Sequence, residues 1–298
     1  MEAHRVNVLL HAIGFGLVTA AIIATSAVAF SLQYAVTDVP NFAHGELLTV
    51  AAYAAYETQQ HGLGLAIGAA AGATTGAAVA YLMYRLVLRG FVWKSSRLVY
   101  TVAVTAGISL IIQNGLGILF GNAEVTLNLP SDQARHVGPF LWTQTDITVI
   151  LGSLVALATV HLTLRHTPFG RAQRAVADNR ELARASGLRI ERVISLTWLM
   201  AGAVAGLGGV ALATSRSTFG PLLGNSFLLV TLAAAIVGGV GRVYGAMIGA
   251  LTIGLVTELS GAYFNAGYKQ VAALAVLTLV LLVRPSGILQ VQRTRAEA

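Results

Sequence analysis

The sequence contains no cysteine and few charged residues. Of its 298 residues, 10% are Asp, Glu, Lys or Arg, against about 25% in an ordinary globular protein. The absence of cysteine excludes disulfides, thiolate metal ligands and a cysteine nucleophile. Hydrophobic residues make up 56% of the chain, and so few charges could not cover a soluble core of that composition. The composition therefore predicts a membrane protein.

Lysine is almost absent as well, and this excludes one kind of nucleotide site. A Walker A loop needs Gly-Lys-Ser/Thr so that the lysine reaches the phosphates. Lys94 follows Trp93 and Lys269 follows Tyr268, so neither of the two lysines completes that motif. Signatures of hydrolases, such as His-Glu-x-x-His and Gly-x-Ser-x-Gly, and histidines at metal-ligand spacing are also absent. We expect no enzyme, no metal site and no cofactor bound by this chain.

Uncharged or nearly uncharged stretches of membrane-spanning length recur along the whole chain. About 20 helical residues cross ~30 Å of hydrocarbon. The stretches are 6–37, 41–59, 58–84, 98–122, 147–164, 193–215, 217–241, 243–263 and 270–283. Their number is open, because 6–37 is longer than one straight helix needs and 217–241 could be re-entrant. We predict an all-α integral membrane protein, a polytopic bundle of eight or nine transmembrane helices in a single domain over residues 1–298.

Basic residues gather in three segments, 85–97, 165–192 and 284–295. Two stretches separate the first segment from the second, and four separate the second from the third if 217–241 crosses. An even number of crossings between two segments returns the chain to the same side of the membrane. All three segments therefore lie on one side, which the positive-inside rule assigns to the cytoplasm. The loop 121–146, with three acidic residues and one Arg, then lies outside. The net charge of +7 is thus explained by membrane orientation, and nucleic acid is not an expected partner.

In two places glycines recur every four residues: Gly64, Gly68, Gly72 and Gly76, then Gly241, Gly245 and Gly249. Small residues at this spacing let two helices approach closely within the bilayer. We interpret both rows as helix-packing faces. The alternative, a glycine-lined sliding surface for a transport cycle, is left open by the sequence.

Several polar residues fall inside the predicted spans, where they are unfavourable unless they face a cavity or a partner. The candidates for a substrate path or gate are Asn41, His44, Gly45, Glu46, Tyr53 and Glu258. Pro40 ends regular helix geometry just before them, and a helix start at this point would offer free N–H groups to an anion. The alternative is that His44 and Glu46 only hydrogen-bond nearby groups and fix a broken helix.

The loop 165–192 has the pattern of a short amphipathic helix. Thr167 can cap a helix whose first residue is Pro168. Gly187 is placed to end that helix in a left-handed conformation. Small apolar residues and charged residues lie on different faces between these two signals. We expect a helix at the cytoplasmic surface; the alternative is a solvated connector that only carries positive charge.

Four motifs of this chain resemble those of one transporter family. Asn41-Phe42-Ala43-His44-Gly45-Glu46 resembles its NFAHGE signature, and 170–188 resembles its version of the EAA loop, which contacts an ATPase. The segments 238–249 and 284–289 are similar to its GGIG…GAMIGG run and its closing R/M-P-T/S-G-I-L. In order and spacing they resemble the LivH-type branched-chain amino-acid ABC transporter permease family. The EAA-like loop departs from the acidic consensus, reading Ala-Val-Ala-Asp at 175–178.

This resemblance implies a permease subunit of an ABC importer in the cytoplasmic (inner) cell membrane. It would translocate branched-chain or related amino acids delivered by an extracytoplasmic substrate-binding protein. Separate ATPase subunits would use the ATP, and a homologous second permease, or a second copy of this chain, would complete the complex. The resemblance places ATPase coupling at Arg174, Ala177, Asp178 and Gly187. A permease for urea or short-chain amides is the alternative, and an ion-coupled secondary transporter is a less favoured one.

Overall fold

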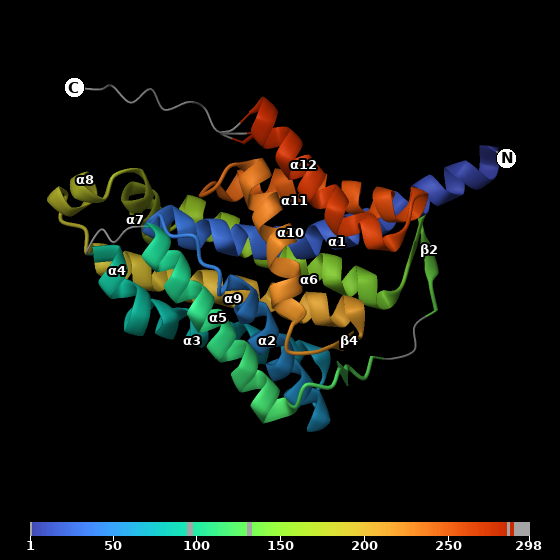
Figure 1. Cartoon of the computed structure of the whole chain (residues 1–298), viewed down its shortest axis with the longest axis horizontal. Helices are drawn as coiled ribbons and strands as arrows, with labels where there is room; N and C mark the ends of the chain where they lie inside the picture. The colour runs from blue at the N-terminus through green and yellow to red at the C-terminus, as the bar shows by residue number, and fades with distance from the viewer. Residues whose placement is uncertain (1, 94–97, 130–132, 285–286, 289–298) are drawn as a thin grey trace.

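The computed structural model describes residues 2–93, 98–129, 133–284 and 287–288, without the side chains of 2–7, 93 and 98. Figure 1 shows most helices running along the long axis of the molecule. The helices are α1 (Glu2–Thr37), α2 (His44–Gln60), α3 (Leu65–Leu82), α4 (Arg89–Trp93), α5 (Leu98–Phe120), α6 (Gln144–His166), α7 (Pro168–Asp178), α8 (Arg180–Ala185), α9 (Ile190–Arg216), α10 (Leu223–Gly238), α11 (Val243–Tyr263) and α12 (Lys269–Val283). A π-helical turn, η1 (Met83–Leu88), joins α3 to α4, and a 3-10 turn, η2 (Ala266–Tyr268), precedes α12.

Four short strands accompany the helices in the described residues, and the sequence did not predict them. β1 (Val125–Thr126) pairs antiparallel with β4 (Thr218–Phe219), and β2 (Arg135–Val137) pairs antiparallel with β3 (Phe140–Trp142). All four lie at one end of the bundle, which we call the strand end, whereas α4, α7 and α8 lie at the opposite end (Figure 1). The strands connect passes of the chain and leave the all-α character of the bundle unchanged.

The number of passes agrees with the prediction of eight or nine. Seven helical segments in the described ranges are long and apolar enough to cross a membrane. The shorter α2 and α10, of 17 and 16 residues, each complete a pass together with a non-helical segment, which makes nine passes in the described chain. Residues 6–37 lie within the single helix α1. The stretch 217–241 crosses, because β4 lies at the strand end and the turn after α10 lines a cavity with α7, which lies at the opposite end.

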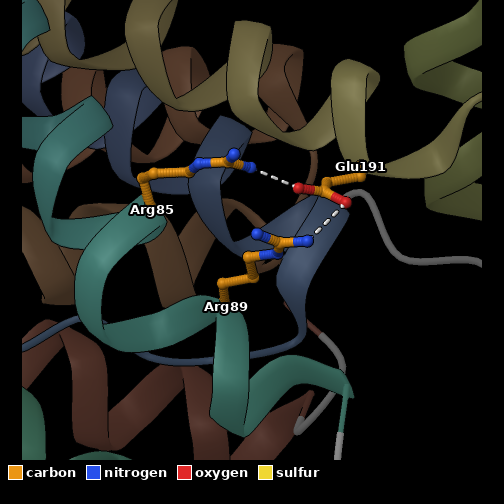
Figure 2. A network of polar contacts seen from close by, with 3 residues as sticks. All are labelled: Arg85, Arg89 and Glu191. Atoms are coloured by element: carbon orange, nitrogen blue, oxygen red, sulfur yellow. Dashed lines mark hydrogen bonds and ion pairs between the residues drawn. The ribbon is translucent and has the colours of Figure 1, made fainter.

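The described parts of the three basic segments meet at the end opposite the strands, which we call the charged end. Arg85 and Arg89 both form ion pairs with Glu191, at the start of α9 (Figure 2). The N–H of Ile288, after α12, donates to the carbonyl of Val237 in α10 at 2.9 Å. This common location was predicted from the even number of passes between the basic segments. Lys94, Arg97, Arg293 and Arg295 lie outside the described residues.

The ion pairs at Glu191 connect the end of the third pass to the first turn of α9, at the end of the loop 165–192. Arg85 belongs to η1 and Arg89 begins α4, and their guanidinium groups reach different oxygens of the same carboxylate (Figure 2). Each partner is about one third exposed or more, so each pair contributes only about 0–1 kcal/mol. This cluster therefore links α9 to η1 and α4 but adds little to the stability of the fold.

Glycines bring the central helices into backbone contact. A Cβ atom at Gly206 in α9 would lie 2.3 Å from the carbonyl oxygen of Gly72 in α3, and one at Gly76 would lie 2.5 Å from that of Gly202. Gly245 and Gly249 of α11 approach the backbone of α10 equally closely. The helix-packing interpretation is confirmed at these positions.

The same interpretation was wrong for the first glycine of each row. Gly64 precedes α3 and has open space around its Cβ position. Gly241 has φ +80° and lies in the turn before α11 begins at Val243. A backbone in that left-handed region favours glycine for conformational reasons, not for helix packing.

We expect Gly206→Ala to destabilise the protein and Gly152→Ala to stabilise it slightly. Alanine in a helix is favoured over glycine by about 1 kcal/mol, and at Gly152 nothing lies within 4 Å of the new Cβ. At Gly206 the same methyl group would overlap backbone, at a cost of about 1–3 kcal/mol. Thermal unfolding in detergent measures both midpoints, and a Gly206→Ala midpoint equal to or above wild type would contradict this packing.

Candidate translocation and coupling sites

The first candidate site is the interruption between α1 and α2. Residues 38–43 are not helical, so their N–H groups need other partners. The Asn41 side chain accepts from the N–H of Ala43 at 3.1 Å, and the N–H of Phe42 donates to Thr105 Oγ1 at 3.3 Å. Asn41 also donates to Gln33 Oε1 at 3.2 Å. Side chains thereby take over contacts that a continuous helix would make through its backbone.

His44 joins three helices from a fully buried position. Its Nδ1 lies 3.2 Å from Gln33 Oε1, and its Nε2 lies 3.1 Å from the carbonyl oxygen of Ser26, both on α1. The Ser26 hydroxyl lies 3.0 Å from that of Thr231 on α10. The sequence had indicated none of these three residues, Ser26, Gln33 and Thr231, as part of the site. A usable signal was present, because Ser26 and Gln33 are seven residues apart and share one face of α1.

The N-terminal ends of α2 and α10 meet inside the bundle at two glycines. A Cβ at Gly45 would lie 2.5 Å from the carbonyl oxygen of Gly224. The N–H of Gly224 donates to Thr49 Oγ1 at 3.0 Å. From this crossing α2 runs to the strand end and α10 to the charged end (Figure 1). The arrangement places two helix starts, with their positive dipole ends, in the interior.

Glu46 and Tyr53 lie further along α2, and both are fully buried. Glu46 Oε1 accepts from the Ser109 hydroxyl of α5 at 2.9 Å, whereas its Oε2 has no hydrogen-bond partner among the described residues. The Tyr53 ring stacks on Phe120 with centroids 4.5 Å apart and meets Phe219 edge-on at 5.2 Å. Glu46 is thus a carboxyl group with spare acceptor capacity between α2 and the peripheral helix α5.

Glu258 stands apart from these residues. Its Oε1 accepts from Thr19 at 2.9 Å, and its Oε2 lies 2.6 Å from Lys269 Nζ. Thr19 precedes Ser26 by two helical turns, a distance of roughly 10 Å along α1. The structure therefore brings Asn41, His44, Gly45 and Glu46 together at the start of α2. It places Tyr53 about two and a half helical turns further along α2 and separates Glu258 from all of them.

The loop 165–192 begins and ends as predicted but contains two helices. Thr167 Oγ1 accepts from the N–H of Gly170 at 3.0 Å, Pro168 is the first residue of α7, and Gly187 has φ +82°. The expectation of one helix was wrong, because Asn179 is extended (φ −155°, ψ 107°) and its side chain caps α8 by accepting from the N–H of Leu182. A local capping bond has replaced the continuation of the helix.

The predicted coupling residues lie on both sides of this break. Arg174 donates to the carbonyl oxygen of Leu164 at the end of α6. Ala177 and Asp178 line a cavity of about 380 Å³ between α7 and the turn that precedes α11. Gly187 follows α8, whose Leu182 side chain is 65% exposed at the charged end. The Leu182 side chain is therefore accessible at this end.

Comparisons with known proteins agree with this architecture. The LivH permease protein of a high-affinity branched-chain amino acid transport system from Escherichia coli K12 is 31% identical over 277 residues, 88% of this chain and 89% of LivH. The corresponding BraD protein from Pseudomonas aeruginosa is 26% identical, over 92% of this chain and 93% of BraD. The solved structure of PsaBC from Streptococcus pneumoniae in complex with Fab shares the fold, with a TM-score of 0.52 at 14% identity over 96% and 97% of the two chains.

A family model covers nearly the whole chain. It is described as the permease component of the branched-chain amino acid transport system, and it matches residues 12–283. The matched range contains both candidate sites, from Asn41 to Glu258, and runs from within α1 to the end of α12. This chain, a multi-pass membrane protein, belongs to the family of branched-chain amino acid transport system permease components.

Proposed function

We propose that this chain is the membrane-spanning permease subunit of an ABC importer that carries branched-chain or related amino acids across the cytoplasmic (inner) membrane. The observation that carries this proposal is the helix pair α7–α8 at the charged end of a family permease whose sequence has no Walker A loop. Separate ATPase subunits supply the energy from ATP. An extracytoplasmic binding protein delivers the substrate, and a homologous second permease, or a second copy, completes the channel.

The charged end faces the cytoplasm in this proposal, in accordance with the positive-inside rule. ATPase subunits dock on α7–α8, through the surface around Arg174, Ala177, Asp178 and Gly187. Displacement of this pair reaches α9 at Glu191, which is held by Arg85 and Arg89 (Figure 2). The displacement then passes from α9 to α2 and α3, because glycines of α9 bring its backbone into contact with the backbones of both helices.

The start of α2 forms the gate or lines the path next to it. Two short helices begin there in the interior, an arrangement that transporters use to face bound ligands with helix N-termini. Asn41 and His44 hold the interruption, Gly45 permits the crossing with α10, and Glu46 contributes a buried carboxyl group. Tyr53 and its aromatic neighbours close the bundle on the side of the strand end.

The orientation is tested by single cysteines, which the natural absence of cysteine makes specific. Val137, in β2, and Leu182, in α8, are both exposed at opposite ends of the molecule. We expect an impermeant maleimide to label Val137→Cys in intact cells and Leu182→Cys only after permeabilisation. The reverse pattern would invert the topology.

Dependence on an ATPase is tested with the assembled transporter. We expect Leu182→Cys to crosslink to the ATPase subunit. We expect Leu182→Asp to lower substrate-stimulated ATP hydrolysis by roughly tenfold, because an unpaired charge buried in a protein contact is unfavourable. Glu57→Cys, exposed near the strand end, is the matched control that should not crosslink. Transport by the purified chain alone, driven by an ion gradient and indifferent to ATP, would instead identify a secondary transporter.

The gate is tested at Glu46. Glu46→Gln keeps the shape and removes the charge of a buried carboxyl group, so we expect normal assembly and transport lowered by roughly tenfold, equivalent to ~1.4 kcal/mol. Glu57→Gln on the same helix is the control, because its carboxylate is exposed. Normal transport by both Glu46→Gln and an assembled Gly45→Leu would leave the segment with a structural role only.

The substrate class is tested by uptake. Uptake of urea or short-chain amides, and not of leucine, would overturn the assignment of branched-chain amino acids as the substrate.

A further inference from the structure

A polar cavity of about 290 Å³ lies toward the strand end, between α1, α9, α10, α11 and α12. Three charged side chains line it: Arg216 at the end of α9, Glu258 on α11 and Lys269 at the start of α12. Arg216 and Lys269 were not among the residues that the sequence singled out. The volume of the cavity is near the lower limit of the ~300–1,000 Å³ that is usual for small-molecule sites.

The charges of this cavity do not cancel. Glu258 already has a cationic partner, because Lys269 Nζ lies 2.6 Å from one of its oxygens, and Thr19 donates to the other. Arg216 makes neither an ion pair nor a hydrogen bond with any described residue. The cavity therefore carries one positive charge without a described protein partner, on the solvent-exposed guanidinium group of Arg216, whose planar fork fits a carboxylate.

The uncharged residues that line the cavity favour a ligand with an aliphatic side chain over a ligand with a further charged group. Ile22 of α1 and Phe227 and Val230 of α10 contribute apolar surface next to the charged residues. A small amino acid presents the same combination, a carboxylate and an ammonium group on a short apolar body. An inorganic anion would leave the apolar part of the cavity without a partner.

The cavity also lies next to the buried network at the start of α2. Ile22 precedes Ser26 by one helical turn on the same face of α1, and Val230 is adjacent to Thr231. The hydroxyls of Ser26 and Thr231 contact each other, and Ser26 contacts His44. Thr19, Ser26 and Gln33 thus continue one polar stripe of α1 from the cavity toward the charged end.

We propose that this cavity binds the amino-acid substrate at the extracytoplasmic mouth of the permease, with Arg216 as the partner of the substrate carboxylate. The inference deepens the proposed function and rests on it. Lys269 and Thr19 hold Glu258 at the opposite wall, where the substrate ammonium group can approach its carboxylate. The substrate would bind here after it leaves the binding protein and before the start of α2 opens.

Binding is measured by protection of a cysteine in the cavity. Ser226 lines the cavity and is exposed, so Ser226→Cys in the reconstituted complex should react with a small thiol reagent. We expect L-leucine to slow this reaction and isopentylamine, which lacks only the carboxylate, to leave it unchanged. Protection should be lost in Ser226→Cys combined with Arg216→Gln. Equal reaction rates with and without leucine at millimolar concentration would overturn the site.

Transport separates this inference from the proposed function. We expect Arg216→Gln to lower leucine uptake at subsaturating substrate by about tenfold or more, as the loss of a charge-assisted hydrogen bond predicts, and Arg216→Lys to restore part of it. Arg135→Gln, which removes an exposed charge from β2 at the same end, should transport normally. If the wild-type complex moves no amino acid, the proposed function fails. If it moves leucine and Arg216→Gln does so equally well, only this inference fails.

Two other occupants would give different results. If Arg216 held the headgroup of an anionic phospholipid, Ser226→Cys would be protected in phosphatidylglycerol nanodiscs and reactive in nanodiscs of zwitterionic phosphatidylcholine, with no effect of leucine. If it received an acidic side chain of the binding protein, ligand-free binding protein would protect the cysteine, and Arg216→Gln would weaken its docking. Either outcome overturns the assignment to the substrate carboxylate.

Discussion

The structure depends on how backbone polar groups are satisfied where two helices are interrupted inside the membrane. No water is available in hydrocarbon, so each exposed N–H or carbonyl group needs a partner from the protein. The side chains of Asn41 and Thr105 serve the segment before α2, and Thr49 serves the start of α10. These bonds allow two helices to begin in the interior, and the candidate gate exists only because they are made.

Close packing determines which helices move together. Glycines let α9 contact α2 and α3, and let α10 contact α11, at distances that leave no room for a side chain. Such contacts tolerate sliding poorly, because a shift of one turn would bring larger residues into the same gaps. By contrast, the most apolar stretches of the spans Val99–Phe120 (α5) and Ala266–Val283 (η2 and α12) are only 17% and 6% buried. In the function that we propose, a push on α9 from the charged end would therefore be transmitted to the central helices, while α5 and α12 lie at the periphery.

Polar groups in the bundle are arranged along one helix instead of being scattered. α1 presents Thr19, Ser26 and Gln33 at seven-residue spacing, and each contacts a different part of the candidate sites. Thr19 belongs to the cavity with Glu258, and Gln33 to the interruption before α2. An uncompensated polar group in a span is costly, so this stripe is retained where other helices supply partners. It gives a physical connection between the substrate cavity and the gate that we propose.

The sequence alone determined the properties that depend on local chemistry. Composition indicated a membrane protein, charge-free lengths predicted the passes, and the signals at Thr167, Pro168 and Gly187 located the coupling loop, because capping and insertion act over one helical turn or one span. The sequence did not predict the break at Asn179, where two local preferences compete.

Only the tertiary structure decided which distant residues meet. Ser26 contacts Thr231 across 205 positions of the chain, and Glu258 lies with Thr19 and Lys269 instead of with Glu46. Periodicity shows which face of a helix is polar, but not which helix covers that face. The pairing follows from packing of the whole bundle, where close approach at glycines fixes the neighbours of every polar side chain.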